Sequence, residues 1–183
     1  AWRMPNRIRS LPIFSATGDV MGILDISGDH RSGSAHPLGL VSTAARMIEN
    51  RLLVAGAKRG LRLHLHAQPE GIGTVAEGIV ALSDDGWIVG ANRAALGLLR
   101  LTLADVGSRL LEQLVETPLQ ALRMHHQRRA HLPMALRLRN GATVFAQVHA
   151  DVSTVGTAVT SSAASGVPLV DVSADTLAHK GDT

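Results

Sequence analysis

The chain has 183 residues, of which 45% are hydrophobic and 18% charged, so it carries enough apolar side chain for a packed core in one domain or in two small ones. A formal net charge of +3 is too small to indicate nucleic-acid binding by itself. The absence of Cys excludes disulfides, thiolate zinc sites and cysteine nucleophiles. Two Trp, two Phe and no Tyr leave almost no aromatic surface on which a single strand of nucleic acid could stack its bases.

Membrane and export signals are also missing from the sequence. Neither an apolar run of about 18 residues nor a basic leader followed by an apolar stretch occurs. We therefore expect a cytoplasmic protein with no membrane span. The chain begins with Ala1 rather than Met, which indicates either that its start was processed or that it is a piece of a longer protein.

The first 60 residues predict a hairpin followed by a long helix. Apolar runs at 11–14 and 20–26 flank a turn, and Pro37 suits the first turn of a helix, where its missing N–H costs nothing. Apolar residues then recur at alternating spacings of three and four, at Leu38, Val41, Ala45, Ile48, Leu52 and Ala55. Such a seam packs a helix either against its own domain or against a second copy of the chain, and both alternatives stay open.

The next stretch predicts a linker and then a hairpin. Residues 61–71 are interpreted as the linker, because Pro69 removes a helix donor and restricts its neighbour. Asp85-Gly86 lies between two apolar runs and is a strong hairpin signal, since Gly tolerates the positive φ that such turns require. Asn92 follows with a side-chain acceptor that suits the start of a helix.

The rest of the chain predicts short helices and a second hairpin. The stretch at 102–105 has the Thr-x-x-acid form that caps a helix, and a further helix is expected from Pro118. Alternating strands then flank the Asn140-Gly141 turn. A flexible tail is expected at 153–183, in which 167–172 is a possible last strand. This order predicts an α+β fold, with an antiparallel sheet and helices on one face.

Two parts of the sequence resemble known families. The strand, turn, strand and capped helix at 78–95 resemble the start of a PAS sensory domain. The earlier hairpin and helix resemble the end of the GAF domain in bacterial sigma-54-dependent activators of the acetoin-catabolism regulator type, in which a GAF domain runs into a PAS domain. The residues that carry this resemblance are those at 12–14, 18, 22–29, 36–41, 45–52, 64–70, 73–78 and 90–95.

The resemblance implies a PAS-like antiparallel sheet, preceded by a partial GAF-like hairpin and a long connecting helix. It implies a partial GAF-like segment and connecting helix at 1–60, the linker at 61–71, a PAS-like sensor domain at 72–152 and the tail at 153–183. The chain has no Gly-x-x-x-x-Gly-Lys-Ser/Thr phosphate loop. The ATPase of such activators, and the contacts to DNA and RNA polymerase, would therefore belong to domains absent from this chain.

A GAF domain has more strands than one hairpin, which leaves the predicted strands of the first segment without their usual cover. Four apolar side chains are affected, at Ile13, Ile23, Leu24 and Ile26. Exposure of each forfeits about 1.5–3 kcal/mol. We therefore expect residues 1–35 to be poorly ordered or to pair with a second chain.

The first candidate sites are a pair of His and a pair of Asp. His64 and His66 would share a face on a strand and could reach one metal ion, but no third ligand accompanies them, so a solvated linker is the favoured interpretation. Asp84 and Asp85 are neighbours at a hairpin tip, where two carboxylates do not converge as an acid–base pair must. We interpret them as turn residues.

The other candidates are a basic run and an apolar pocket. The run consists of Arg123, His125, His126, Arg128, Arg129 and His131. It suits a solvated helix end, with contact to nucleic acid or an acidic partner as the alternative. An axial haem ligand at His125 or His126 is a weaker alternative. The positions that could line a PAS pocket are Val80, Leu82, Ile88, Leu96 and Leu99, which are equally consistent with plain core.

These observations predict the sensory and regulatory region of a bacterial transcription regulator. A small-molecule effector would shift the sensor between two arrangements, and the helix at 37–55 would pass the change on and serve as a homodimer contact. The alternative is a stand-alone PAS-like dimerisation module that senses nothing. No catalytic, cofactor-binding or metal-binding residue is assigned, and an enzyme is not expected, because no acid, base and nucleophile converge.

Overall fold

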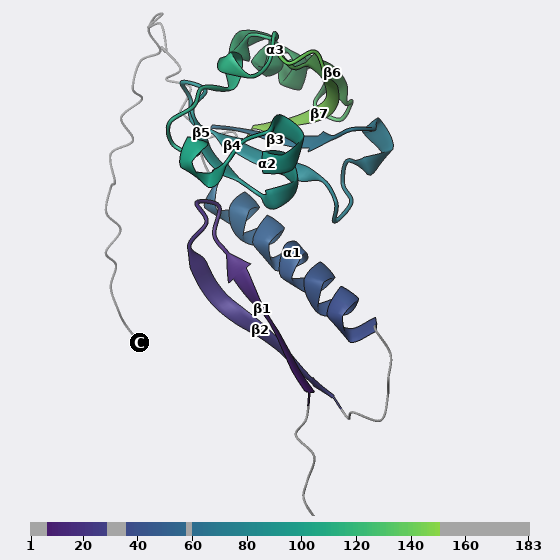
Figure 1. The fold of residues 1–183 in the computed structure, drawn as a ribbon. Helices are drawn as coiled ribbons and strands as arrows, with labels where there is room; N and C mark the ends of the chain where they lie inside the picture. Colours follow the sequence, from purple (N-terminus) through teal and green to yellow (C-terminus); the bar gives the residue numbers. More distant parts are fainter. Residues whose placement is uncertain (1–6, 29–35, 58–59, 151–183) are drawn as a thin grey trace, which may run out of the picture. The chain divides into compact units, whose positions relative to one another are not determined.

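The structure, a computed structural model, describes residues 7–28, 36–57 and 60–150 (Figure 1). Its strands and longer helices are, in chain order, β1 (Arg7–Phe14), β2 (Val20–Gly28), α1 (His36–Gly56), β3 (Leu61–His66), β4 (Gly78–Leu82), β5 (Ile88–Ala91), α2 (Arg93–Leu99), α3 (Leu119–Arg129), β6 (Met134–Arg137) and β7 (Thr143–Ala150). Short 3-10 helices occupy Pro69–Gly71, Leu103–Asp105 and Leu111–Gln113. The predicted tail at 153–183, with its possible strand at 167–172, lies outside the described residues. Within the described ranges, no helix has the length and apolar character needed to cross a membrane.

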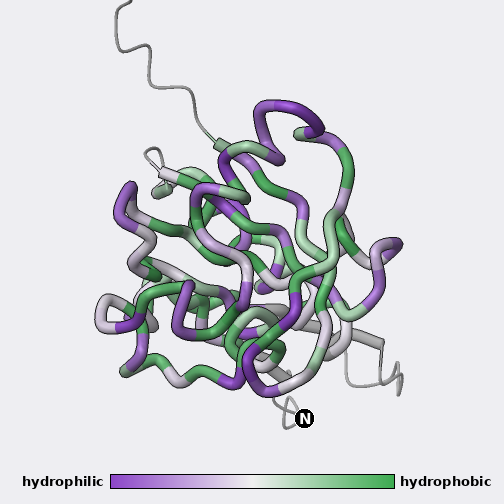
Figure 2. Tube along the Cα trace, turned by 90° about the horizontal axis from the view of Figure 1, so that it is seen from above, coloured by the Kyte–Doolittle hydropathy of each residue, from purple (hydrophilic) through white to green (hydrophobic). Residues whose placement is uncertain are grey.

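The fold is α+β, as the sequence predicts. A five-stranded antiparallel sheet has the order β5-β4-β3-β7-β6, and β1 and β2 form a separate two-stranded antiparallel sheet. Helices α2 and α3 cover one face of the larger sheet (Figure 1). The core between them includes Leu63, Val80 and Leu122, which are fully buried. In Figure 2 hydrophilic residues concentrate at several outlying turns, while hydrophobic residues follow the inner segments.

The segment interpreted as a linker, 61–71, instead begins with the middle strand of the sheet. Strand β3 pairs antiparallel with both β4 and β7. Leu61 lies opposite Leu82 of β4 on one side and opposite Ala150 of β7 on the other. Its residues alternate strictly between buried and half-buried, because Leu61, Leu63 and Leu65 face the core. The alternation of leucines with Arg and His is present in the sequence. The polar residues between the leucines, however, are also typical of a solvated segment, which is the basis of the linker interpretation. The linker interpretation of 61–66 is therefore wrong.

Helix α1 matches the predicted helix at 37–55 closely in its ends, but it buries a different face. Val41 and Ala45 are buried as expected, whereas Leu52 is 41% exposed and Leu53 is only 2% exposed. The buried positions are spaced by four residues and include Glu49, whose side chain is 10% exposed. On a helix of 3.6 residues per turn, a spacing of four advances the buried stripe by about 40° per step, so the stripe winds around α1 instead of following the predicted seam.

The β1–β2 hairpin packs against α1 rather than remaining without cover. Ile13 and Leu24 are half-buried, while Ile23 remains 68% exposed. The expectation that this whole segment lacks cover is therefore corrected for Ile13 and Leu24, because α1 of the same chain covers one face of the hairpin.

Candidate functional site

Asn92 connects the sheet to helix α1 through four hydrogen bonds. Its Oδ1 accepts from the N–H groups of Ile79 and Ala95, each at 2.9 Å, so it caps α2 as the sequence predicts. Its Nδ2 donates to Asn50 Oδ1 of α1 at 2.8 Å and to the Glu77 carbonyl at 2.9 Å. A single amide thus holds β4, α2 and α1 at one point.

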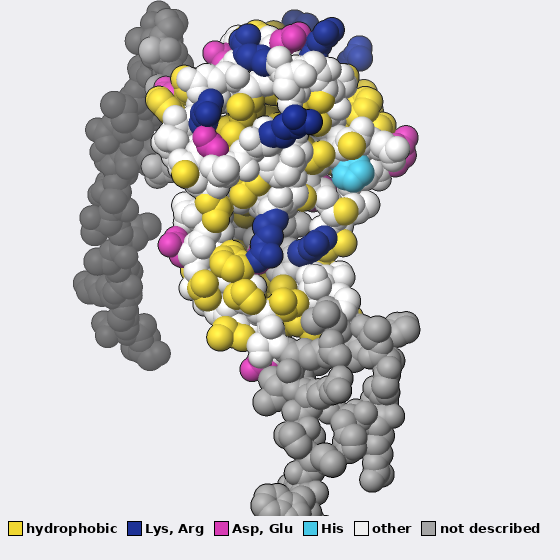
Figure 3. Space-filling model, viewed as in Figure 1, with side chains coloured by type: hydrophobic (Ala, Val, Ile, Leu, Met, Phe, Trp, Pro, Cys, Tyr) yellow, Lys and Arg dark blue, Asp and Glu magenta, His cyan; other side chains and the backbone are white. Residues whose placement is uncertain are grey.

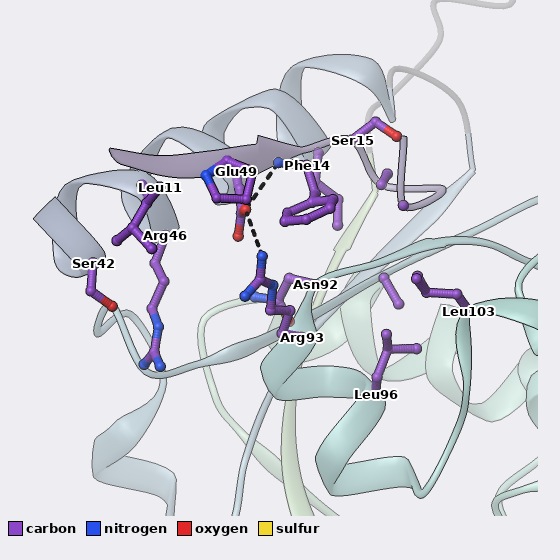
Figure 4. A pocket seen from close by; sticks show the side chains of 16 residues that line it. Leu11, Phe14, Ser15, Ser42, Arg46, Glu49, Asn92, Arg93, Leu96 and Leu103 are labelled. Atoms are coloured by element: carbon purple, nitrogen blue, oxygen red, sulfur yellow. Dashed lines mark hydrogen bonds and ion pairs between the residues drawn. The ribbon is translucent and has the colours of Figure 1, made fainter. Parts of the chain in front are cut away.

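Glu49 forms a second connection, one residue before Asn50. Its Oε1 accepts from the N–H of Phe14 at 3.0 Å and lies 3.6 Å from a guanidinium nitrogen of Arg93 (Figure 4). The Arg93 guanidinium also lies over the Phe14 ring, 4.5 Å from its centre. A nearly buried carboxylate of α1 therefore meets both the hairpin and the start of α2.

The turn between β1 and β2 reaches the free edge of the larger sheet. The N–H of Ala91 donates to the carbonyl of Ala16 at 3.1 Å. A Cβ placed on Gly90 would lie 2.8 Å from Cβ of Ala16, so the turn approaches β5 closely. Gly18 holds the turn with a φ of +94° under the side chain of Leu103. We call this set of contacts between α1, the β1–β2 turn and the β4–β5–α2 region the joint.

Apolar packing also contributes to the joint. Leu53 and Val54 of α1 pack against Ile79 and Ala81 of β4, on the sheet face opposite α2 and α3. Arg62 of β3 donates to the Val54 carbonyl at 2.9 Å. This apolar cluster is smaller than the core on the other face of the sheet, and polar contacts add to it.

A cavity of about 500 Å³ lies within the joint. Its lining residues are Leu11, Pro12, Phe14, Ser15, Ala16, Gly18, Ser42, Ala45, Arg46, Glu49, Leu53, Ala91, Asn92, Arg93, Leu96 and Leu103. The volume falls within the range of about 300–1,000 Å³ that is typical of small-molecule pockets. Apolar side chains predominate and a few polar ones converge, as in such pockets.

Apart from Ser15 of the β1–β2 turn, the polar side chains of the cavity come from two helices. Ser42, Arg46 and Glu49 lie on α1, while Asn92 and Arg93 lie at the start of α2. Figure 4 shows Arg46 on one side of the Glu49–Arg93 pair, with Leu96 and Leu103 on the other. A smaller hollow of about 170 Å³ shares four of these residues, Arg46, Glu49, Asn92 and Arg93. The arrangement can bind a molecule with one polar end.

A second polar cluster lies on the same sheet face as α1. His64 Nδ1 is 3.1 Å from a carboxylate oxygen of Glu77, and its ring lies 4.5 Å from that of His149. Burial by itself raises the pKa of Glu77, but hydrogen bonds from His64 and from the N–H of Gly73 bring this pKa below its ordinary value. Burial, followed by the electrostatic influence of the neighbouring His64 and Arg62, lowers the pKa of His149. The cluster is therefore arranged for an ionised Glu77 and a neutral His149.

The structure places His64 and His66 on one strand but gives them different partners. His64 faces Glu77, whereas His66 Nδ1 accepts from the N–H of Gln68 at 3.1 Å. Among the described residues, no group of three or more His, Cys, Asp or Glu could hold a metal ion. The solvated-linker interpretation is wrong for His64, whose side chain is only 16% exposed.

Asp84 and Asp85 lie in the predicted turn, which is confirmed. The N–H of Gly86 donates to the carbonyl of Ser83 at 3.0 Å, and both Asp residues are exposed. Arg123 of α3 donates to the Asp84 carbonyl at 2.7 Å. The Asp84 carboxylate also lies 3.5 Å from the Arg123 guanidinium, so Asp84 links the turn to α3.

The basic run at 123–131 lies on α3 and just beyond its end. His125 Nε2 and His126 Nδ1 each lie 2.9 Å from a backbone carbonyl, of Leu132 and Val148 respectively. Neither His lines the cavity, so nothing in the described geometry favours a haem ligand. The arginines at the end of the run, Arg128 and Arg129, are exposed, as a solvated helix end requires.

Most of the predicted PAS-pocket residues belong to the core. Val80, Leu82, Ile88 and Leu99 are at most 4% exposed and do not line the cavity, whereas Leu96 does. The sequence analysis missed Ser42, Arg46, Glu49 and Asn50. The available signal was Glu49, a charged residue four positions from both Ala45 and Leu53 on an otherwise apolar helix face.

Comparison with known proteins gives little further information. No protein-family model matches the sequence, and no curated protein matches it. A structure described as "Crystal Structure of the E.coli DhaR(N)-DhaL complex" matches with 14% sequence identity and a TM-score of 0.24. The alignment covers 78% of this chain and 54% of that one. A TM-score of this size carries no argument about fold or function.

Proposed function

We propose that the chain is the sensory region of a bacterial transcription regulator, with a binding and signalling role and no catalysis. An effector binds in the cavity of the joint and changes how firmly α1 is held against the PAS-like sheet. Helix α1 then passes this change to further domains of the regulator. The PAS-like order of elements and the resemblance of the sequence to sigma-54-dependent activators support the assignment.

The observation that carries the proposal is the mixed character of the joint. Polar bonds from Asn50 to Asn92 and from Glu49 to Arg93 lie beside a cavity large enough for a small molecule. An effector shifts an equilibrium only if it binds one arrangement more tightly than the other. A molecule that contacts both α1 and α2 meets this condition, because it binds fully only when the joint is closed.

A thermal-shift screen of small metabolites on the full chain tests the proposal, since a ligand that binds only the folded state raises the melting temperature. The key variant is Gly90→Val, whose side chain would collide with Ala16 and displace the β1–β2 turn. Gly97→Ala in α2 is the matched control, because nothing lies within 4 Å of its new methyl group. Effectors should stabilise the unmodified chain and Gly97→Ala but not Gly90→Val. Equal stabilisation of all three chains, or none in any, contradicts the proposal.

A second function, a homodimerisation module, is supported by exposed apolar side chains. Leu40 and Met47 lie on the face of α1 that the hairpin leaves open and are 63% and 49% exposed. Val20, Met21 and Ile23 of β2 are also exposed, and Figure 3 shows hydrophobic side chains gathered over the hairpin. A second copy would cover Leu40 and Met47 rather than the predicted Val41 and Ala45, which the chain itself already buries.

Sedimentation of the full chain tests the dimer. Met47→Glu should convert a dimer to a monomer, while Arg128→Glu, an exposed charge change on α3, serves as the control. A monomeric unmodified chain, or a Met47→Glu variant that remains dimeric, removes this second function.

A further inference from the structure

The charges around the cavity do not balance. Arg46 and Arg93 carry two positive charges against the single negative charge of Glu49. Glu49 already accepts the N–H of Phe14 and faces Arg93. Within the described part of the chain, the Arg46 guanidinium makes no hydrogen bond or ion pair. It therefore remains available to a ligand.

The Arg46 guanidinium and the apolar side chains of Leu96 and Leu103 lie at different ends of the cavity, while Leu11 lies on the Arg46 side (Figure 4). Ser42 precedes Arg46 by four residues on α1, so the hydroxyl and the guanidinium share one face of the helix. Leu96 and Leu103 line the cavity on the other side of the Glu49–Arg93 pair (Figure 4). The ring of Phe14 lies between these two ends. A ligand that fits both ends has a charged group and an apolar body.

We propose that the cavity of the joint binds a small organic carboxylate, with its anionic group on Arg46 and Ser42 and its apolar body against Phe14, Leu96 and Leu103. This inference rests on the proposed function, because it names the ligand class of the same cavity. Guanidinium groups bind carboxylates through two parallel hydrogen bonds, which fixes the orientation of the ligand as well as its charge.

Ligands of other charge fit the cavity less well. A cation would meet two guanidinium groups, while the one carboxylate that could attract it is already engaged. A neutral molecule of the same shape would displace water from the Arg46 guanidinium without supplying a charged acceptor in its place. Its affinity for the cavity is therefore lower than that of the carboxylate. The carboxylate is the class that gains from both ends of the cavity.

Calorimetric titration of the full chain tests the inference with probes of matched shape. Phenylacetate and octanoate are the carboxylates, while phenylacetamide and phenethylamine supply the neutral and cationic counterparts of the aromatic probe. We expect the carboxylates to bind, more weakly as salt is added, and the counterparts to bind at least about tenfold more weakly, as expected for a lost charge-assisted contact. Arg46→Gln should weaken carboxylate binding about tenfold, and Arg51→Gln, on the exposed face of α1, should leave it unchanged.

A third variant tests whether the ligand binds inside the cavity. Leu103 is 48% exposed and lines the apolar end, so Leu103→Trp should fill that end at little cost in stability and weaken both carboxylates. If neither carboxylate binds, or if Arg46→Gln binds them as well as the unmodified chain, the inference is wrong. If phenylacetamide binds as tightly as phenylacetate, or if only neutral metabolites stabilise the chain in the thermal-shift screen, the ligand class is wrong while the sensory function stands. If the sensory function is wrong, ligands should stabilise the Gly90→Val variant as much as the unmodified chain.

Discussion

Two regions of the molecule bury their apolar residues to very different extents. The first consists of strands β3–β7 with helices α2 and α3, and the second consists of the β1–β2 hairpin with α1. In the first region, the buried side chains of every strand contribute to one core, and Leu63, Val80 and Leu82 have no exposed surface. In the second, Val20 and Ile23 of β2 are 62% and 68% exposed, because among the described residues α1 covers one face of the hairpin and the other face stays open. A five-stranded sheet with helices on one face encloses a core, whereas a two-stranded sheet with one helix leaves a face open.

The difference explains why the joint is suited to regulation. A region with a complete core stays folded when its contacts change, and it can act as a fixed support. The hairpin and α1 attach to this support through Asn50, Glu49 and the β1–β2 turn, with little apolar area. Regions with few buried apolar contacts open at lower free energy, and movable elements come from such regions.

The largest expected effect tests the core of the first region. Leu63→Ala removes a fully buried side chain from the middle strand of the sheet and should lower the free energy of unfolding by about 3–5 kcal/mol. Ile23→Ala in the hairpin should change it by less than about 0.5 kcal/mol. Urea unfolding followed by circular dichroism measures both, and similar losses in the two variants would remove the contrast between the regions.

The next effect tests the residue that connects the two regions. Asn92→Ala removes the cap of α2, worth about 1 kcal/mol, and leaves the N–H of Ile79 without its partner, at about 1–3 kcal/mol. The expected loss in unfolding free energy is thus about 2–4 kcal/mol. Asn92→Asp keeps the acceptor but loses the donor to Asn50 and to the Glu77 carbonyl, so it should preserve the cap of α2 while it loosens α1. Hydrogen exchange of the α1 amides should be faster in both variants than in the unmodified chain. If it is unchanged in both, Asn92 does not hold the helix.

A smaller effect concerns the pH dependence of the first region. The folded pKa of Glu77 lies below its ordinary value of 4.5, so its ionised form adds stability above that pH, and this contribution is lost as the pH falls below it. The folded pKa of His149 lies below its ordinary 6.5, so the unfolded chain takes up that proton first, and stability also falls as the pH drops through this range. Both groups therefore make the folded chain less stable in acid.

Melting temperatures measured from pH 7 to pH 4 separate the two contributions. Glu77→Gln should flatten the curve near pH 4.5 and below, and His149→Gln should flatten it near pH 6.5. The Glu77→Gln variant also loses the charge-assisted hydrogen bond from His64, which should lower its free energy of unfolding by about 1–2 kcal/mol at pH 7. An unchanged slope in both variants would contradict the assignment of these groups.

The smallest effect is expected at Asp105, which caps a 3-10 helix on the surface. The N–H and the hydroxyl of Thr102 donate to its carboxylate at 2.8 and 2.7 Å, and, with Arg109, they lower the pKa of Asp105 to about 2. The stability that this carboxylate adds is complete above its ordinary pKa of 3.8 and is lost as the pH falls toward 2. Asp105→Asn should lower the melting temperature slightly at pH 7 and by less at pH 2, and a nuclear magnetic resonance titration of Asp105 measures the pKa itself.

The sequence by itself determined the local features of this protein. Asn92 caps α2, Asp85-Gly86 and Asn140-Gly141 form tight turns, and the long helix begins and ends within one residue of its predicted limits. These features depend on φ preferences, on caps and on apolar periodicity, all of which act between residues close in the chain. The α+β fold class followed from the order of the same elements.

Only the tertiary structure decided where the elements lie and which residues form the cavity. Strand β3 became the middle strand because β4 and β7 both pair with it, across gaps in sequence that no local pattern spans. Glu49 is buried because Phe14 and Arg93 approach it from segments 35 and 44 residues away, as the numbering of the three residues gives. A cavity is defined by side chains from distant segments, so the periodicity of any one of them cannot reveal it.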